Sequence, residues 1–372
     1  MSLTVGVIGG GQLARMMIPP AIELGIHLRV FAENEGSSAE LAAITVGDYT
    51  DAAQVLRFAR DVDVVTFDHE HVPQQVLAEL VAAGVRVHPS PAALAVAQDK
   101  LVMRERLTAL GLPVPDWARV GDSAALGAFL EDHGGAAVVK TPRGGYDGKG
   151  VRVVRSADAA DDWFASVGDL LVEELVDFRR ELAQLVARRP SGEVGYWPLV
   201  ESIQQDGVCA EVIAPAPSSA GRLADTATDI ALAIAEGLGV TGVLAVELFE
   251  TTDDRLLINE LAMRPHNSGH WSIDGSSTSQ FEQHLRAVLD LPLGATGMLR
   301  EWAVMVNVLG GPATGSLTDR YTTALADQPA VKFHSYGKEP RPGRKVGHVT
   351  AIGRDLDEVV FEARAASAFF EN

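Results

Sequence analysis

Apolar and polar positions along the first hundred residues follow two periods, which predicts strands that alternate with helices. Leu3 to Ile8 is a continuous apolar run, and the apolar residues after it recur at helical spacing until Gly25. His27 to Phe31 and Val62 to Phe67 are further short apolar runs. Strands that alternate with helices form a parallel, doubly wound sheet, so we expect a Rossmann-like α/β domain at residues 1–97.

The pattern then predicts two further domains of mixed α+β structure. Lys100 to Leu110 has helical spacing, and the glycine and prolines after it end this helix. A central domain is expected at residues 98–186, where three apolar runs predict strands: 136–140, 151–154 and 170–176. A third domain is expected at residues 187–372. It would contain an amphipathic helix at 223–238, a small β-rich subdomain from about residue 298 with strands near 303–309 and 348–352, and a closing helix at 355–370.

Two apolar runs in the third domain, Val243 to Phe249 and Leu256 to Leu261, are separated by Thr252-Asp253-Asp254 and predict a hairpin. If the two aspartates form a two-residue loop, Glu247 lies directly opposite Glu260. Facing carboxylates repel one another, and a hard divalent cation with oxygen ligands would compensate. The pair therefore indicates a magnesium site shared with nucleotide phosphates, although a solvated acidic hairpin would carry the same residues.

Small polar and anion-binding residues follow Glu260 directly. The run from Arg264 to His270 reads Arg-Pro-His-Asn-Ser-Gly-His. An arginine can bind a carboxylate or a phosphate through two parallel hydrogen bonds, and Asn and Ser add short polar groups. Because this run lies just after an expected metal ligand, it indicates an active site.

A lysine ends the strand expected at 136–140, and a glycine-rich turn follows it. Lys140 can reach a phosphate while its stem stays packed, and four glycines between Gly144 and Gly150 let the backbone close over phosphate oxygens. The spacing is not that of a Walker loop, and a tight hairpin without a ligand is the alternative. Farther on, Leu171 to Val176 is typical of a strand with acids at its end, and Glu181 follows within reach.

The composition limits which partners and which cellular compartment the protein fits. The chain has 372 residues, 47% hydrophobic and 22% charged, as in a globular protein of two or three domains. A formal net charge of -19 argues against nucleic acid as a partner. The single cysteine, Cys209, excludes an internal disulfide and fits a reducing compartment. We find no signal peptide and no run of membrane-spanning length, so we expect a cytoplasmic protein that does not bind membranes.

The N-terminal glycines allow a different interpretation. Gly9-x-Gly11-x-x-Ala14 follows the first strand and matches a dinucleotide-binding fingerprint, and Glu33 lies where a ribose-binding acid could sit. An NAD-dependent oxidoreductase is therefore an alternative, although any close helix–strand approach favours the same glycines. A non-catalytic nucleotide-sensing protein is a third class, and such a protein would lack one of the two metal carboxylates.

Considered together, the motifs resemble those of the ATP-grasp ligases. The shared features are a strand lysine, a glycine-rich lid, a Glu-Glu-Leu-Val segment and paired carboxylates that end in Asn259-Glu260. Four segments in order resemble the N5-carboxyaminoimidazole ribonucleotide synthetase family over essentially the whole chain: Gly9 to Leu13, Gly144 to Gly150, Asn259 to Gly269, and Tyr336 to His348. The resemblance implies an ATP-grasp fold and the ATP- and bicarbonate-dependent carboxylation of 5-aminoimidazole ribonucleotide through carboxyphosphate, in purine biosynthesis.

The same resemblance implies roles for individual residues. Glu247 and Glu260 would hold Mg²⁺, and Arg264, Asn267 and Ser268 would contact bicarbonate and carboxyphosphate. The residues expected to contact ATP are Lys100, Lys140, Gly145, Tyr146, Gly148, Lys149, Gly150, Glu173, Glu174, Leu175, Val176, Glu181, Gln204, Asn259 and Glu260. The residues expected to hold the ribonucleotide are Gln12, Leu13, Glu70, His71, Tyr146, Asp147, His266, Lys338, Arg344 and Lys345. Asp147 is the candidate general base, and the family suggests a homodimer.

The chain departs from the family pattern at two positions. Gln204 stands where the family often has His, which puts a nucleotide contact there in question, and Lys100 stands where Arg is common. Strict strand alternation also places Asn259 on the opposite face from Glu260. The nearest alternative is another ATP-grasp enzyme, such as the formate-dependent glycinamide ribonucleotide transformylase, and the segment Tyr336 to His348 argues against it.

Overall fold

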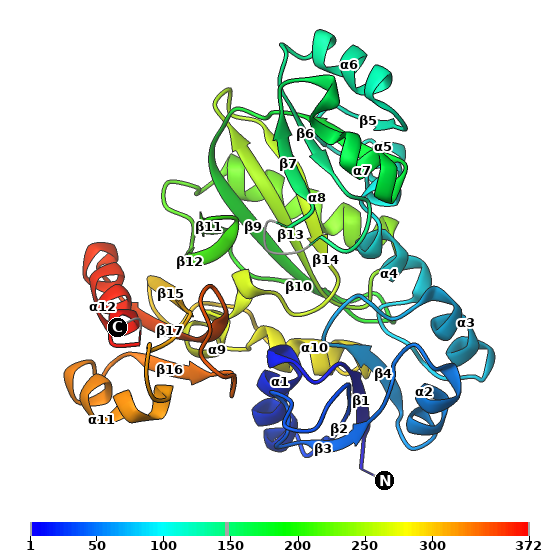
Figure 1. Ribbon diagram of the computed structural model, residues 1–372. Helices are drawn as coiled ribbons and strands as arrows, with labels where there is room; N and C mark the ends of the chain where they lie inside the picture. Colours follow the sequence, from blue (N-terminus) through cyan, green and yellow to red (C-terminus); the bar gives the residue numbers. More distant parts are fainter. Residues whose placement is uncertain (1, 146–148, 371–372) are drawn as a thin grey trace.

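The N-terminal part of the chain forms a four-stranded parallel sheet in the order β3-β2-β1-β4. The structure is a computed structural model that describes residues 2–145 and 149–370. The elements of this part are β1 (Thr4–Ile8), α1 (Gln12–Glu23), β2 (His27–Ala32), β3 (Ala43–Val46), α2 (Ala52–Ala59), β4 (Val64–Phe67), α3 (Gln74–Ala82) and α4 (Pro91–Gln98). The doubly wound parallel sheet predicted here is confirmed, and it forms the blue part of Figure 1.

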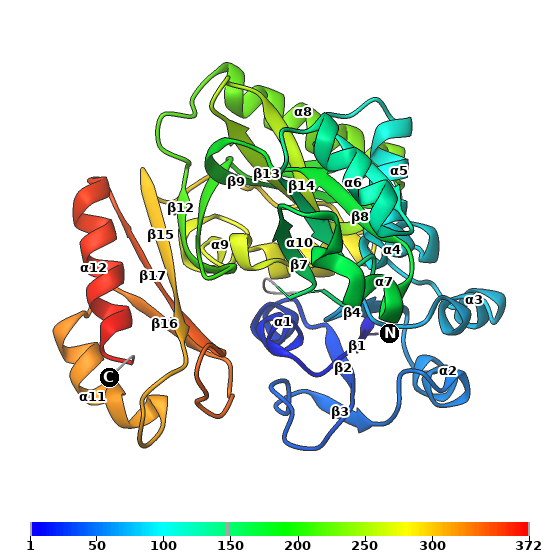
Figure 2. The same ribbon diagram turned by 45° about the horizontal axis from the view of Figure 1, so that its top comes forward.

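A small antiparallel sheet in the order β5-β8-β6-β7 follows. Its elements are α5 (Lys100–Ala109), β5 (Trp117–Val120), α6 (Ser123–Asp132), β6 (Ala137–Lys140), β7 (Val151–Val154), η1 (Ala157–Ala160), α7 (Asp161–Val167) and β8 (Leu170–Glu174). Lys140 is the last residue of β6, so the glycine-rich segment between β6 and β7 leaves the sheet at the lysine. Figures 1 and 2 show this sheet beside the β13–β14 hairpin described next.

The largest sheet is antiparallel, in the order β14-β13-β9-β11-β12-β15-β17-β16, and β10 pairs with β9. Its strands are β9 (Phe178–Arg188), β10 (Val194–Tyr196), β11 (Val200–Gln205), β12 (Val208–Ala214), β13 (Gly242–Thr251), β14 (Leu256–Ala262), β15 (Trp302–Leu309), β16 (Lys332–Ser335) and β17 (Lys345–Gly353). The hairpin that carries the candidate metal ligands is β13–β14, at one edge of this sheet.

Helices cover the large sheet and join it to the N-terminal domain. They are α8 (Arg222–Gly237), η2 (Asn267–Gly269), α9 (Ser272–Gly275), α10 (Gln280–Val288), α11 (Leu317–Asp327) and α12 (Leu356–Ala368). Ile234 of α8 packs against Leu182 and Leu244 of the sheet, and Phe281 of α10 shares a core with Met17 of α1. Figure 2 shows α11 and α12 beside β15–β17. In the described part of the chain, no helix is both long and apolar enough to span a membrane.

Two of the expected domain divisions differ from the arrangement of the sheets. Residue 186 lies within β9, which belongs to the large sheet, so a division there would cut a strand. We propose that the central domain ends before Phe178. The β-rich piece from about residue 298 extends the large sheet, because β15 pairs with β12 and places Met305 opposite Val212. Pairing between strands that are distant in sequence leaves no local pattern, so this continuity could not be predicted from the sequence.

Candidate active site

A cavity of about 1110 Å³ lies between the small sheet, the β13–β14 hairpin and the N-terminal domain. Side chains from all parts of the chain line it: Glu70 follows β4, Lys140 ends β6 and Lys345 begins β17. The residues selected from the sequence that line this cavity are Glu70, His71, Lys100, Lys140, Gly145, Glu173, Glu174, Leu175, Val176, Glu181, Gln204, Glu247, Asn259, Glu260, Arg264, His266, Asn267 and Lys345.

The β13–β14 hairpin places Glu247 directly opposite Glu260, which confirms the predicted pairing. The two-residue loop that led to this pairing is wrong, because Thr251 pairs with Arg255 and three residues form the turn. A β-bulge at Asn259 compensates for the additional turn residue, since Leu248 lies opposite Ile258. The predicted register is therefore correct because the additional turn residue and the bulge offset one another.

The bulge also changes the direction of Asn259. In a regular strand consecutive side chains point to opposite faces, but the side chains of Asn259 and Glu260 both contact lysines that line the cavity, Lys140 and Lys100. Asn259 has no pairing partner on β13, as expected of the additional residue in a bulge. The expectation that Asn259 faces away from Glu260 is thus wrong.

Glu247 resists ionisation in the protein alone. Burial, followed by the neighbouring carboxylates of Glu260 and Glu181, raises the pKa of Glu247 to about 8. Burial raises the pKa of Glu181 to about 6. A divalent cation would reverse this effect, because its charge stabilises the ionised carboxylates. Among the described residues, no group of three or more His, Cys, Asp or Glu side chains is placed to hold a metal ion.

Two buried lysines reach the same side of the cavity from different elements. Lys100 begins α5, and its Nζ lies 2.9 Å from Glu260 Oε1. Lys140 ends β6, and its Nζ lies 2.6 Å from Glu173 Oε2 and 3.3 Å from Asn259 Oδ1. Burial lowers the pKa of Lys140, and the Glu173 carboxylate opposes that effect. These two amines are placed to meet an anionic ligand.

A buried arginine that the sequence analysis did not select completes the lysine cluster. Arg104 is 0% exposed, and its Nε donates a hydrogen bond to Glu173 Oε1 at 2.5 Å. The Glu173 carboxylate is therefore held between Arg104 and Lys140, and each of its two oxygens has a partner within the protein. The signal in the sequence was the spacing from Lys100 to Arg104, four residues on one helix face.

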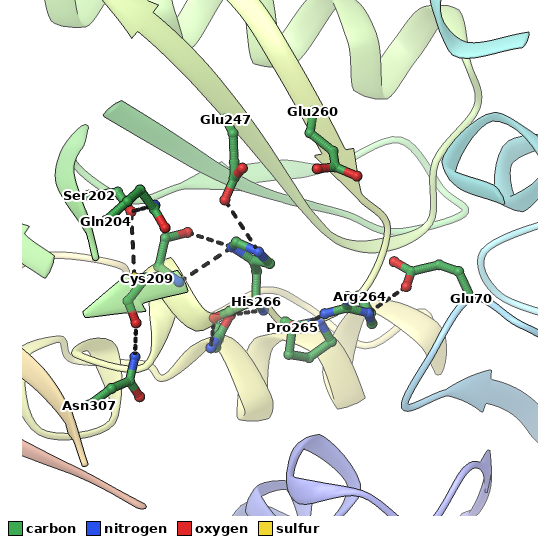
Figure 3. A network of polar contacts seen from close by, with 12 residues as sticks. Glu70, Ser202, Gln204, Cys209, Glu247, Glu260, Arg264, Pro265, His266 and Asn307 are labelled. Atoms are coloured by element: carbon green, nitrogen blue, oxygen red, sulfur yellow. Dashed lines mark hydrogen bonds and ion pairs between the residues drawn. The ribbon is translucent and has the colours of Figure 1, made fainter. Parts of the chain in front are cut away.

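Arg264 connects the large sheet to the N-terminal domain. Its Nε donates a hydrogen bond to Glu70 Oε2 at 2.7 Å, and both side chains line the cavity. Figure 3 shows Arg264 between the hairpin carboxylates and the loop that carries Glu70. Arg264, predicted to contact bicarbonate, and Glu70, predicted to contact the ribonucleotide, are therefore in direct contact.

His266 lies below Glu247 in Figure 3 and faces it. Its Nδ1 accepts a hydrogen bond from the backbone N–H of Ser268, so the proton of the neutral ring is on Nε2, which lies 3.5 Å from Glu247 Oε1. Burial, followed by the positive charges of Arg264 and Lys345, lowers the pKa of His266 to about 3. Ser268 is fully buried behind His266 and does not line the cavity.

The N-terminal domain and the segment after β16 are held together beside the cavity. Lys338 Nζ donates a hydrogen bond to Gln12 Oε1 at the start of α1. Arg15 donates to the backbone carbonyls of Ser38 and Ser335, both at 2.9 Å. These contacts bring two segments predicted to hold the ribonucleotide to the same place.

Other residues predicted to hold the ribonucleotide lie in the hydrophobic core or outside the cavity lining. Leu13 is buried in the core around α1, and Lys338 and Arg344 lie outside the lining of the cavity. Tyr146, Asp147 and Gly148 lie outside the described residues. Lys149 and Gly150 follow them, and the carbonyl of Gly150 accepts a hydrogen bond from the backbone N–H of Thr141.

The start of α1 is occupied by a side chain of the protein itself. Asp68, which follows β4, accepts a hydrogen bond from the backbone N–H of Ala14 at 2.8 Å. A Cβ at Gly11 would collide with the same carboxylate, which gives this glycine a packing role. Glu33 is 3.0 Å from His69 Nε2. A carboxylate stands where the dinucleotide motif would bind pyrophosphate, so the geometry argues against the oxidoreductase alternative.

Sequence profiles of three domains match the chain in order. They are a ribonucleotide synthetase preATP-grasp domain at residues 1–98, an ATP-grasp domain at residues 105–281 and a phosphoribosylaminoimidazole carboxylase C-terminal domain at residues 303–361. The chain therefore has the ATP-grasp fold with a preATP-grasp domain before it.

Whole-length relatives agree with these profiles. The chain is 52% identical to N5-carboxyaminoimidazole ribonucleotide synthase of Mycobacterium tuberculosis, over 98% of this chain and 86% of that protein. It resembles the crystal structure of the synthetase from Thermus thermophilus with a TM-score of 0.89 at 35% identity, over 99% of both chains. A structure from Aspergillus clavatus in complex with ADP and 5-aminoimidazole ribonucleotide gives a TM-score of 0.89 at 31% identity, over 99% of this chain and 98% of that one.

Proposed function

The chain belongs to the N5-carboxyaminoimidazole ribonucleotide synthetase family of ATP-grasp ligases, and from this premise we propose that it uses ATP to carboxylate 5-aminoimidazole ribonucleotide. The protein is an ATP-dependent ligase of purine biosynthesis. The observation that carries the proposal is one cavity that contains the Glu247–Glu260 pair, the buried lysines and the run that begins at Arg264. This set combines a phosphoryl-transfer site with anion ligands beside it.

The nucleotide binds between the small sheet and the β13–β14 hairpin. Lys100 and Lys140 contact its phosphates, and the lid that includes Gly145 and Lys149 closes over them. The backbone of 173–176 meets the adenine edge, and Glu181 accepts hydrogen bonds from the ribose hydroxyls. Gln204 lines the same cavity and donates to Ser202 Oγ at 2.9 Å, so a carboxamide takes the place of the more common imidazole.

Magnesium fits the donor set at the hairpin. Glu247 and Glu260 supply carboxylate oxygens from opposite strands, and Asn259 adds an amide oxygen beside them. When bound, the cation neutralises charge on the γ-phosphoryl group as that group is transferred. Lys100, which pairs with Glu260 in the protein alone, is near enough to share that role.

Bicarbonate binds beside Arg264 and Asn267, with Ser268 holding His266 behind them. A bicarbonate oxygen attacks the γ-phosphorus of ATP, the bond to the β-phosphate oxygen breaks, and carboxyphosphate and ADP form. Carboxyphosphate then breaks to CO2 and phosphate, and the exocyclic amine of the ribonucleotide attacks the CO2 carbon. Asp147 takes the proton that the amine releases. The closed lid keeps water from the labile intermediate.

The ribonucleotide lies between the N-terminal domain and the Arg264 run. Glu70, His71 and His266 border its base, together with Tyr146 and Asp147 of the lid. Lys338, Arg344 and Lys345 meet its phosphate, and the start of α1 at Gln12 and Leu13 closes the site. The cationic cluster suits a phosphate monoester in a protein whose net charge is otherwise negative.

The test of this function is phosphate release from Mg-ATP and bicarbonate, with and without 5-aminoimidazole ribonucleotide. The expected result is strong stimulation by the ribonucleotide, with one carboxylated product formed for each ADP. ATP cleavage that is indifferent to the ribonucleotide would contradict the proposed acceptor. Glycinamide ribonucleotide with formate would then be the next substrate pair to assay.

We also propose that the enzyme is a cytoplasmic homodimer. The resemblance to the family supports the dimer, and a single buried cysteine, Cys209, suits a reducing compartment. Sedimentation equilibrium of the purified chain would report the oligomeric state, and a monomer at micromolar concentration would contradict the dimer.

A further inference from the structure

One face of α5 contacts two consecutive residues of β14. Lys100 and Arg104 are four residues apart, so their side chains lie on the same side of the helix. Lys100 reaches the Glu260 carboxylate, and Arg104 Nη2 donates to the backbone carbonyl of Asn259 at 2.7 Å. Asn259 is the additional residue of the bulge and has no ladder partner on β13. Arg104 therefore satisfies a carbonyl at the position where the strand is irregular.

Arg104 is also connected to Asn259 indirectly, through its Nε, Glu173 and Lys140. Its Nε donates to Glu173, the other Glu173 oxygen contacts Lys140 Nζ, and Lys140 Nζ donates to Asn259 Oδ1. Four residues thus form a closed ring that joins α5, β8, β6 and β14. Three members of the ring line the cavity, whereas Arg104 is fully buried and does not.

We propose that Arg104 is a positioning residue for the nucleotide: it fixes Lys140 through Glu173 and holds the bulge that turns Asn259 into the cavity. The inference rests on the proposed function, because it assigns the nucleotide phosphates to that side of the cavity. Arg104 itself touches no substrate. Its effect reaches the phosphates through Lys140 and through the residues next to the metal carboxylates.

A guanidinium group suits this position because it binds two separate acceptors at once, a carboxylate on β8 and a backbone carbonyl on β14. A planar guanidinium presents Nε and Nη2 in a fixed geometry, and here one donates to a side chain and the other to a backbone carbonyl. A lysine at this position would keep the charge but could not bind both acceptors with one short ammonium head. An Arg104→Lys variant should therefore keep the buried charge and lose the ring.

The test is binding of Mg-ADP and of the ribonucleotide, measured separately by calorimetry on the purified chain. Variants Arg104→Lys and Arg104→Met are compared with Arg106→Met, an exposed arginine two residues later on the same helix. We expect Mg-ADP to bind both Arg104 variants about tenfold or more weakly, the scale of losing a charge-assisted hydrogen bond. Ribonucleotide binding should stay within about twofold, which also reports that the variants are folded.

Steady-state kinetics give a second readout. The KM for ATP should rise in Arg104→Lys while the KM for the ribonucleotide stays constant, and Arg106→Met should match the unmodified chain. Equal loss of both ligands in both Arg104 variants would overturn the proposal and leave Arg104 a general stabilising residue. Unchanged Mg-ADP binding would overturn it as well. A failure of the proposed function would be distinguishable from a failure of the Arg104 proposal. In the first case the unmodified chain itself would bind Mg-ADP without carboxylating the ribonucleotide.

Discussion

Asn259 and Glu260 are consecutive residues of one strand, yet both side chains line the same cavity. The β-bulge at Asn259 produces this arrangement, because the additional residue interrupts the alternation of the strand. The two residues also have different partners: Lys140 donates to the Asn259 side chain, and Lys100 pairs with Glu260. One irregular strand position therefore places an amide and a carboxylate beside two buried cations.

Replacing Asn259 with alanine should weaken nucleotide binding without disturbing the bulge. The backbone carbonyl that accepts from Arg104 remains in this variant, and the amide oxygen that Lys140 contacts is lost. We expect the KM for ATP to rise about fivefold to tenfold, the scale of one hydrogen bond of about 1 kcal/mol. Initial rates at varied ATP would measure this change. A rise in the KM for the ribonucleotide instead would mean that Asn259 faces the other substrate.

Substitution of Glu260 by glutamine should remove a major electrostatic group at the phosphates. We expect turnover to fall at least about 10²-fold, the scale of losing a preorganised stabiliser of developing charge. The measurement is ADP formation as magnesium is varied. Glu236→Gln, at an exposed position near the end of α8, is the matched control and should keep normal turnover. A mild effect of Glu260→Gln with unchanged magnesium dependence would contradict the assignment.

The raised pKa of Glu247 predicts a pH-dependent loss of stability in the absence of divalent cations. The folded protein keeps a proton on Glu247 up to a pKa of about 8, whereas the unfolded chain releases it near the ordinary glutamate pKa of 4.5. Folding therefore takes up a proton between these values, so the contribution of Glu247 to stability falls as pH rises through this window.

Thermal melting of the unmodified chain and of Glu247→Gln, in chelator from about pH 5 to pH 8, would measure this effect. Glutamine cannot ionise, so the melting temperature of the variant minus that of the unmodified chain should increase with pH. A difference that is constant across the range would show that Glu247 ionises at its ordinary value. Magnesium with a nucleotide should reduce the pH-dependent difference by stabilising the ionised carboxylate.

Lys338→Ala should affect the ribonucleotide and spare ATP. The lysine contacts Gln12 across the junction of the N-terminal domain and the last part of the chain, and it is not among the residues that line the cavity. We expect the KM for the ribonucleotide to rise by about tenfold or more, since a charge-assisted contact with a phosphate is lost. Lys332→Ala, at an exposed position of β16, is the control. An effect confined to ATP would mean that the ribonucleotide phosphate binds elsewhere.

Local pattern was sufficient for much of the fold. The strand expected at 151–154 is β7, and the helix expected at 223–238 is α8, within one residue at each end. These features depend on residues close in sequence, because the spacing of apolar side chains within a short segment predicts whether it forms a helix or a strand.

Other features depended on contacts between distant segments. The continuity of β12 with β15 and the contact of Arg264 with Glu70 have no signature in either segment alone. Arg104 was missed because an arginine on an amphipathic helix usually faces solvent, and the acceptors that accompany its burial lie on the distant strands β8 and β14.

The sequence by itself determined the elements, the order of the motifs and the chemical types of the site residues. It did so because periodicity, turn residues and charged side chains act over a few positions. The tertiary structure alone decided that Asn259 faces the cavity, that Asp68 occupies the start of α1 and that Arg104 joins Glu173 to β14. Each of these involves a polar contact with a distant part of the chain: Asn259 with Lys140, Asp68 with Ala14, and Arg104 with Glu173 and β14.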